Sequence, residues 1–124
     1  MQLRITVSLV IILLSLALQV HLGMANDVNL ETSSALNDLG ISRSRKGDLD
    51  RAIKNFTKAI EFNPNNGEAY NNRGITLIRK KDFKGAIADF TKAIGIDPKN
   101  DQFYFNRANA RKWSQDDNGS RPPG

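Results

Sequence analysis

The sequence predicts an all-α protein, a short α-solenoid of stacked helix–turn–helix units, and two observations support this prediction. Residues 33–66 align with residues 67–100 without a gap, and 16 of the 34 aligned columns are identical. Each unit also contains two stretches with the apolar spacing of amphipathic helices. A repeat of this period is typical of arrays in which each unit buries its apolar face against its neighbours. A third copy begins at Asp101 and loses the pattern after Trp113, which gives about two and a half units.

The second half of each unit carries the clearest helical pattern. Its apolar residues recur at three- and four-residue steps, which defines one face of a helix with 3.6 residues per turn. These residues are Leu49, Ala52, Ile53, Phe56, Ala59 and Ile60 in the first unit, and Phe83, Ala86, Ile87, Phe90, Ala93 and Ile94 in the second. Asp48 and Asp82 directly precede the two patterns. We expect both to be N-caps, because a carboxylate there accepts free backbone N–H groups.

The first half of each unit is a helix that ends in basic residues. Gly47 suits the left-handed turn that often follows a helix, whereas Lys81 stands at the same place in the second unit. We therefore expect a strained or differently shaped turn at Lys81. Stacking would align the basic residues of successive units into a basic rim, made of Arg43, Arg45, Lys46, Arg79, Lys80, Lys81, Arg111 and Lys112. This rim either compensates the helix dipoles or attracts an acidic partner.

These patterns resemble the tetratricopeptide repeat (TPR), whose signature places an aromatic residue, Leu-Gly, a second aromatic, Ala, Phe and Pro within 34 residues. The resemblance covers residues 33–113 and departs from the signature at Leu36, Arg43, Arg73 and Leu77. It implies two TPR units, 33–66 and 67–100, followed by residues 101–113 as the first helix of a partial third repeat or as a capping helix. The implied repeat core is Leu36, Leu39, Gly40, Ala52, Phe56, Ala59, Pro64, Tyr70, Gly74, Ala86, Phe90, Ala93 and Pro98.

Residues 1–25 have the layout of a secretory signal peptide. Arg4 precedes an apolar run over residues 5–20, and residues 23–25 offer Gly and Ala to a signal peptidase, which predicts cleavage after Ala25. The alternative is an uncleaved membrane anchor over residues 5–22, since this run approaches the roughly 20 residues needed to span a bilayer. We therefore expect an exported protein, periplasmic or secreted, or else one that stays anchored in the membrane.

Two polar segments flank the repeats. Residues 26–32 form a polar lead-in, and residues 114–124 are predicted to be a disordered tail because they carry no apolar side chain to bury. The helix expected at 101–113 has more aromatic side chains than the repeat requires, namely Phe103, Phe105 and Trp113. We expect these side chains to be exposed and adhesive, so self-association through residues 101–113 is one option.

The composition argues against catalysis and metal binding. The chain has no Cys, and His21, its one histidine, lies in the predicted signal peptide. Without these side chains the usual nucleophile–base pairs and zinc ligands are missing from the mature chain. The charges are interleaved and only mildly basic, which does not favour a nucleic-acid partner. We expect a protein that is not an enzyme and that needs no cofactor and no metal.

The resemblance implies a module that binds a protein or peptide segment, with an acidic partner as one option. The alternatives are a structural repeat element that self-associates within an envelope assembly, and a membrane-anchored TPR adaptor. By resemblance, a concave peptide-binding groove would be lined by Asn37, Asn71, Asn72, Ile75, Ile78, Arg79, Phe105, Asn106, Asn109 and Trp113. Asn72 and Asn106 carry amides that can pair with the backbone of an extended peptide.

The carboxylate clamp known from this family grips chaperone C-terminal tails and uses Lys, Asn, Asn, Lys and Arg at five groove positions. This chain has Asn37, Ile41, Asn72, Gln102 and Asn106 at those positions, so the resemblance disfavours that class of ligand.

One paired exchange between the two units predicts an ion pair. The first unit has Leu39 and Asn55 where the second has Arg73 and Asp89. An unpaired arginine between helices is costly, so we expect the Arg73 guanidinium to meet the Asp89 carboxylate.

Overall fold

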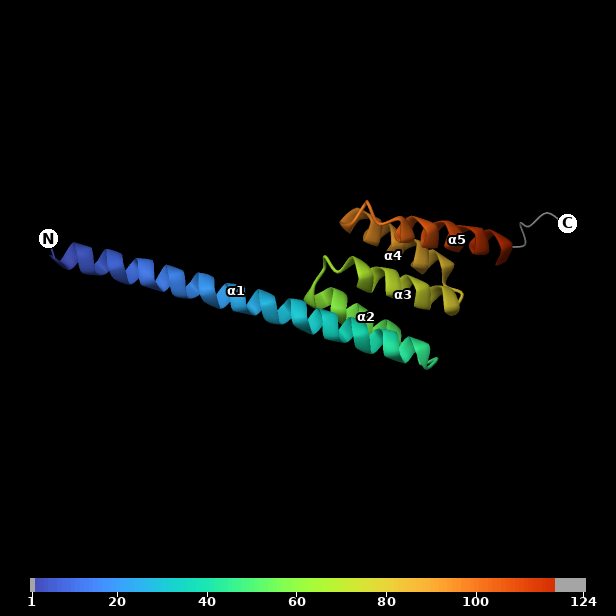
Figure 1. The fold of residues 1–124 in the computed structure, drawn as a ribbon, viewed down its shortest axis with the longest axis horizontal. Helices are drawn as coiled ribbons and strands as arrows, with labels where there is room; N and C mark the ends of the chain where they lie inside the picture. Colours follow the sequence, from blue (N-terminus) through green and yellow to red (C-terminus); the bar gives the residue numbers. More distant parts are fainter. Residues whose placement is uncertain (1, 118–124) are drawn as a thin grey trace.

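The computed structural model describes residues 2–117, and these residues form helices joined by short turns. The helices are α1 (Gln2–Arg45), α2 (Leu49–Phe62), α3 (Gly67–Arg79), α4 (Phe83–Ile96) and α5 (Asp101–Asp117). The described residues contain no strand. Figure 1 shows the helices stacked in chain order, with α3 between the pair α1–α2 and the pair α4–α5. The fold is therefore all-α, as the sequence predicts.

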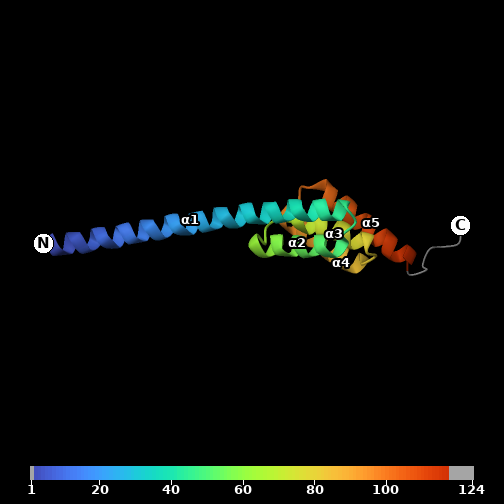
Figure 2. The same ribbon diagram turned by 90° about the horizontal axis from the view of Figure 1, so that it is seen from below.

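Helix α1 has two parts with different surroundings. Its C-terminal part packs on α2 and α3, whereas its N-terminal part projects away from the bundle (Figures 1 and 2). Every large hydrophobic side chain from Leu3 to Leu30 is more than half exposed. Within the described residues, α1 is the one helix long and apolar enough to cross a membrane. The polar lead-in, residues 26–32, is helical and continuous with both parts of α1.

The core of each repeat forms where a phenylalanine ring meets a glycine. A Cβ atom on Gly40 would lie 2.5 Å from Cε1 of Phe56, and one on Gly74 would lie 2.7 Å from Cε1 of Phe90. Glycine is therefore required for this close approach of the two helices. Other small residues let the helices pack closely, and all of these are fully buried: Ala52, Ala59, Ala69, Ala86 and Ala93.

Three residues of the predicted repeat core are exposed, and each has a physical reason. Leu39 is 43% exposed because its position borders the preceding repeat, as Arg73 borders Thr57, and no earlier repeat unit lies among the described residues. Pro64 and Pro98 lie in the surface turns after α2 and α4. Their fixed backbone geometry ends the helices, and this does not require burial.

The turns after α1 and α3 have the same shape. Gly47 N donates to Ser44 O at 3.0 Å, and Lys81 N donates to Ile78 O at 2.8 Å. The next residue in each turn, Asp48 or Asp82, donates back to the helix in the same way. Gly47 has φ 83° and Lys81 has φ 62°, so the lysine is strained in a turn that favours glycine.

The predicted N-caps at the start of α2 and α4 are confirmed. Asp48 Oδ1 accepts from Arg51 N at 3.4 Å, and Asp82 Oδ1 accepts from Gly85 N at 2.9 Å. Asn66 caps α3 in the same way, because its Oδ1 accepts from Ala69 N at 3.0 Å.

The C-terminal helix differs from its prediction in two respects. Helix α5 continues to Asp117, so residues 114–117 are helical and do not belong to a disordered tail; the rest of that predicted tail lies outside the described residues. Phe103 is only 2% exposed, because its ring packs 3.5 Å from the place of a Cβ on Gly67. The expectation that Phe103 is an exposed adhesive residue is therefore wrong. Phe105 and Trp113 are exposed, at 62% and 42%.

Candidate functional site

The first helices of the repeats, α1, α3 and α5, lie side by side and present one common face. Two hollows open between neighbouring helices of this face. The smaller hollow, between α1 and α3, has a volume of about 250 Å³. It is lined by Ile41, Ser44, Arg45, Phe56, Asn72, Ile75, Thr76 and Arg79. Three predicted groove residues, Asn72, Ile75 and Arg79, therefore line it.

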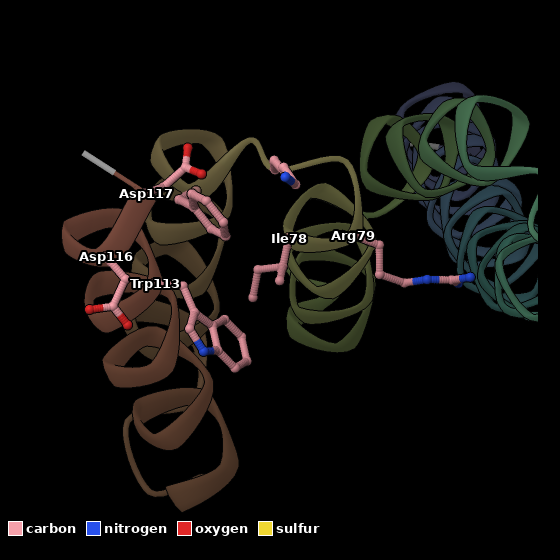
Figure 3. Close-up of a pocket in the computed structure, with 7 residues that line it drawn as sticks. Ile78, Arg79, Trp113, Asp116 and Asp117 are labelled. Carbon is pink, nitrogen blue, oxygen red and sulfur yellow. The ribbon is translucent and has the colours of Figure 1, made fainter. Parts of the chain in front are cut away.

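The larger hollow lies between α3 and α5 at their C-terminal ends and has a volume of about 490 Å³. Figure 3 shows Ile78 on α3 and Trp113 on α5 pointing toward the space between the two helices. Charged groups of both signs surround this apolar pair. The remaining lining residues are Arg79, Lys81, Phe83, Asp116 and Asp117. Ile78 and Trp113, both predicted for the groove, thus belong to one site.

The asparagines of this face are engaged with one another across the repeats. Asn72 Nδ2 donates to Asn37 Oδ1 at 3.0 Å, and Asn106 Nδ2 donates to Asn71 Oδ1 at 2.8 Å. The two bonds are related by the repeat of 34 residues. Together they form an asparagine ladder that links α1 to α3 and α3 to α5.

The asparagine ladder changes the predicted role of one residue. Asn71 is only 5% exposed, so it lies between the helices and does not line an open groove. Asn71 is buried because it faces the next repeat. A buried amide needs a hydrogen-bond partner, and Asn106 provides it. Phe105 takes the corresponding position on α5 and remains exposed. Neither Phe105 nor Asn109 lines either of the two hollows.

The predicted ion pair between Arg73 and Asp89 is confirmed. Arg73 Nε and Nη2 donate to Asp89 Oδ2 and Oδ1, both at 2.8 Å, which is a bidentate geometry. Arg73 Nη1 also donates to Thr57 Oγ1 of the preceding repeat at 3.0 Å. The pKa of the Arg73 guanidinium is raised above its ordinary value, first because of its hydrogen bonds to Asp89, while burial opposes this shift. The arginine therefore keeps its charge although it lies between helices.

The basic rim is only partly available to a partner. Arg43 Nη1 donates to Asn55 Oδ1 at 2.5 Å, and Arg79 Nη1 donates to the backbone carbonyl of Ser44. Lys80 forms an ion pair with Asp50. Arg79 and Lys80 thus join the second repeat to the first, and Arg43 joins α1 to α2, so these three members of the rim are engaged within the chain.

Sequence reasoning assigned no role to Ser33, which is fully buried where α1 joins the bundle. Its hydroxyl donates to Ala59 O at 2.8 Å and accepts from Asn66 Nδ2 at 2.9 Å. Ser33 thereby connects α1 to the end of α2 and to the cap of α3. A possible signal was its place in the alignment, since a hydroxyl replaces the glycine found at Gly67.

The described residues contain no group of three or more His, Cys, Asp or Glu side chains that could hold a metal ion. The site consists of two hollows lined by apolar side chains, amides and charges of both signs. Such an arrangement can bind a polypeptide segment through apolar contacts and hydrogen bonds.

Comparisons with known proteins agree with this architecture. The family model of the tetratricopeptide repeat matches residues 37–101. The Arabidopsis OM64 TPR domain is 32% identical, with a TM-score of 0.66 over 68% of this chain and 69% of that chain. The TPR2B domain of yeast Sti1, in complex with pHsp70, is 29% identical, with a TM-score of 0.67 over 69% of each chain. The first TPR domain of Spaghetti (RPAP3), bound to the HSP90 peptide SRMEEVD, is 26% identical, with a TM-score of 0.68 over 70% of this chain and 69% of that chain. A comparison with curated proteins found no match.

Proposed function

Because the chain belongs to the tetratricopeptide repeat family, we propose that it is a non-catalytic module that binds an extended segment of another protein on the face formed by α1, α3 and α5. The observation that carries this proposal is the pair of hollows between these helices, with exposed apolar side chains beside them. Ile75 is 39% exposed and Trp113 is 42% exposed. Exposed apolar side chains on a rigid face favour binding, because a partner can bury them from water.

The chemistry of the face favours a segment with apolar side chains and some acidic character. Ile75 and Ile78 with Trp113 offer apolar contacts, and Arg45 and Arg79 border the smaller hollow. Related TPR domains of RPAP3 and Sti1 were solved with HSP90 and Hsp70 segments, which supports a peptide ligand. The clamp positions of this chain carry the amides of Asn37, Gln102 and Asn106 where the clamp has cations, and Ile41 where it has an Asn. A chaperone C-terminal tail is therefore not the ligand that we propose.

The experiment selects peptides from a displayed random library on the full chain in lipid nanodiscs, with empty nanodiscs as the blank. The best peptide should lose about tenfold or more in affinity with Ile75→Glu, and likewise with Trp113→Glu, since each would bury a charge against the ligand. Phe62→Glu is the matched control, because Phe62 is 44% exposed and lies on α2, away from both hollows. Equal losses in all three variants would contradict the proposed site.

We further propose that the repeats are exported and that the N-terminal part of α1 directs this export. The support is an apolar, exposed helical segment next to the N-terminus, preceded by Arg4 and followed by polar residues. Whether residues 1–25 are then cleaved or residues 5–22 remain as an anchor is decided by N-terminal sequencing of the protein from cells. A chain beginning at Asn26 indicates cleavage. A chain that keeps Arg4 and partitions with membranes indicates the anchored adaptor.

A second candidate function is a structural element that self-associates. The observation that favours it is Phe105, which is 62% exposed on α5 at a position that contacts the neighbouring first helix in the preceding repeats. Sedimentation of the full chain in nanodiscs over a range of protein concentrations tests this. A mass that rises with concentration and returns to the monomer with Phe105→Ser supports self-association. A constant monomer leaves the peptide-binding module as the function.

A further inference from the structure

Among the described residues, no helix covers one face of α5, although the same face is covered in both complete repeats. Helix α2 covers α1 and helix α4 covers α3, with Phe56 against Gly40 and Phe90 against Gly74. Adding the repeat length of 34 residues places four residues of α5 at the covered positions. These residues define the open face of α5: Tyr104, Arg107, Ala108 and Arg111. Tyr104 is 41% exposed, and in the described part of the chain no helix packs over this face.

Arg107 is held in the pose that Arg73 has in its ion pair. Arg73 donates to Thr57 Oγ1 at 3.0 Å and lies 5.6 Å from the ring centroid of Tyr70. Arg107 donates to Thr91 Oγ1 at 3.3 Å and lies 5.7 Å from the centroid of Tyr104. The difference is the carboxylate. Arg73 meets Asp89 of the covering helix, whereas among the described residues no carboxylate pairs with Arg107.

Arg111 adds a second cation at a repeat position whose equivalent in the first repeat, Arg43, contacts the covering helix. In the first repeat the corresponding residue is Arg43, which donates to Asn55 of the covering helix at 2.5 Å. Asn55 occupies the same repeat position as Asp89. Each complete repeat thus uses one arginine, Arg43 or Arg73, to hold this side chain, whereas α5 carries an arginine at both positions. Two cations around one position favour a carboxylate over an amide.

We propose that the open face of α5 binds an amphipathic helix of a partner protein, and that this helix places an Asp or Glu side chain between Arg107 and Arg111. Ala108 limits the size of the apolar residue that the partner helix can place against it. It replaces the glycine against which Phe56 and Phe90 pack, and a Cβ at those glycines would lie only 2.5 and 2.7 Å from the ring. The docked helix therefore carries a residue smaller than Phe beside its acid. This surface shares no residue with the two hollows, so it is separate from the proposed peptide site.

The chain supplies a probe for this proposal in its own helix α4. The probe is a synthetic, fluorescently labelled peptide of residues 82–97 with Phe90→Leu to suit Ala108, and the control peptide carries Asp89→Asn in addition. Binding to the full chain in lipid nanodiscs is measured by fluorescence anisotropy. The Asp peptide should bind saturably and about tenfold or more tighter than the Asn peptide, because the latter leaves two cations without an anion.

Two variants of the protein test whether the peptide binds on α5. Arg107→Leu introduces the residue found at Leu39, and Arg111→Leu introduces the residue found at Leu77, so each side chain already occurs at that place in another repeat. Each variant should keep the thermal unfolding curve of the parent and reduce the preference for the Asp peptide. If one variant fails to fold, the other and the peptide pair decide the question.

The following results would overturn the proposal. Equal affinity for the two peptides, or no saturable binding of either, shows that no acid is recognised. A preference that survives both arginine variants shows that the peptide binds elsewhere, for example by displacing α4. A parent chain that sediments as a dimer and becomes monomeric with Arg107→Leu shows that a second copy, not a partner helix, covers this face.

Discussion

Lys81 stores strain at a single backbone position, since its φ of 62° lies in the region that favours glycine. Lys81→Gly should raise the free energy of unfolding by about 1 kcal/mol, which is the removed strain less the greater freedom of glycine in the unfolded chain. Urea unfolding of the full chain in mild detergent, followed by circular dichroism, measures the change. Gly47→Ala, at the equivalent turn, should lower stability by a similar amount. A destabilised Lys81→Gly variant would show that the lysine side chain contributes more than its backbone costs.

Asn55 and Asp89 occupy equivalent positions in the two repeats, and their side chains should differ in their contribution to stability. Asp89→Asn leaves the half-buried Arg73 without its anion and should cost about 1–3 kcal/mol, discounted from a fully buried pair because Arg73 keeps some contact with water. Asn55→Ala removes a single hydrogen bond from Arg43, which can turn to water, and should cost about 1 kcal/mol or less. The same unfolding assay compares the two. Equal small losses would show that the ion pair adds nothing.

Some of these side-chain contacts could be predicted from the sequence and others could not. The Arg73–Asp89 pair was visible because both residues change together between the two units. The exposure of Leu39 and the burial of Phe103 were not visible, since each depends on which neighbour is present. Among the described residues no preceding repeat lies beside Leu39, and Phe103 fills the space above Gly67. An alignment of two units describes a middle repeat well and an end repeat poorly.

The asparagine ladder joins neighbouring first helices, so the two amides of each hydrogen-bonded pair should contribute to stability together. Asn72→Ala and Asn37→Ala should each lower stability by about 1 kcal/mol, and the double variant should cost clearly less than their sum. Asn106→Ala should match Asn72→Ala, because it breaks the equivalent bond to Asn71.

Asn109→Ala is the control for the ladder, since Asn109 lies on α5 and its side chain takes no part in the two amide bonds of the ladder. The measurement is a double-mutant cycle by urea unfolding. Additive losses for Asn37 and Asn72 would show that the two amides are independent, and a large loss for Asn109→Ala would show that the ladder is not special.

The ladder also explains why the candidate site was only partly predictable. Asn72, Ile75, Ile78, Arg79 and Trp113, which the family resemblance assigned to a peptide groove, line the two hollows. The sequence could not show that Asn72 bonds to Asn37 and Asn106 to Asn71, because the spacing within one helix carries no information on the distance between helices. The second helices were easier to predict, since their apolar stripes, caps and terminal prolines all indicate the same element.

The stacked arrangement of the chain followed from its internal repeat, because a repeated amphipathic pair buries its apolar face in one way. The sequence did not predict that α1 would continue from Gln2 to Arg45 without a break. Residues 26–32 contain no Pro and no Gly, so nothing in them ends a helix once it has formed on both sides. The helix propensity of this segment does not determine its conformation, so the helical segments on both sides of it do.

An unbroken α1 means that, in an anchored chain whose α1 is tilted from the membrane normal, residue count sets which side of the repeats faces the membrane. Each residue inserted between Asn26 and Thr32 would rotate the stack by about 100° and lift it by about 1.5 Å. One inserted alanine should therefore turn a given side of the stack away from the lipid surface, and four should return it to within about 40°. The chain has no native cysteine, so a single cysteine at Lys58 can carry a fluorophore for quenching by labelled lipid headgroups. Quenching should oscillate with insertion length for a rigid helical shaft. A steady decline would show that the shaft bends freely and that the repeats face the membrane in no fixed direction.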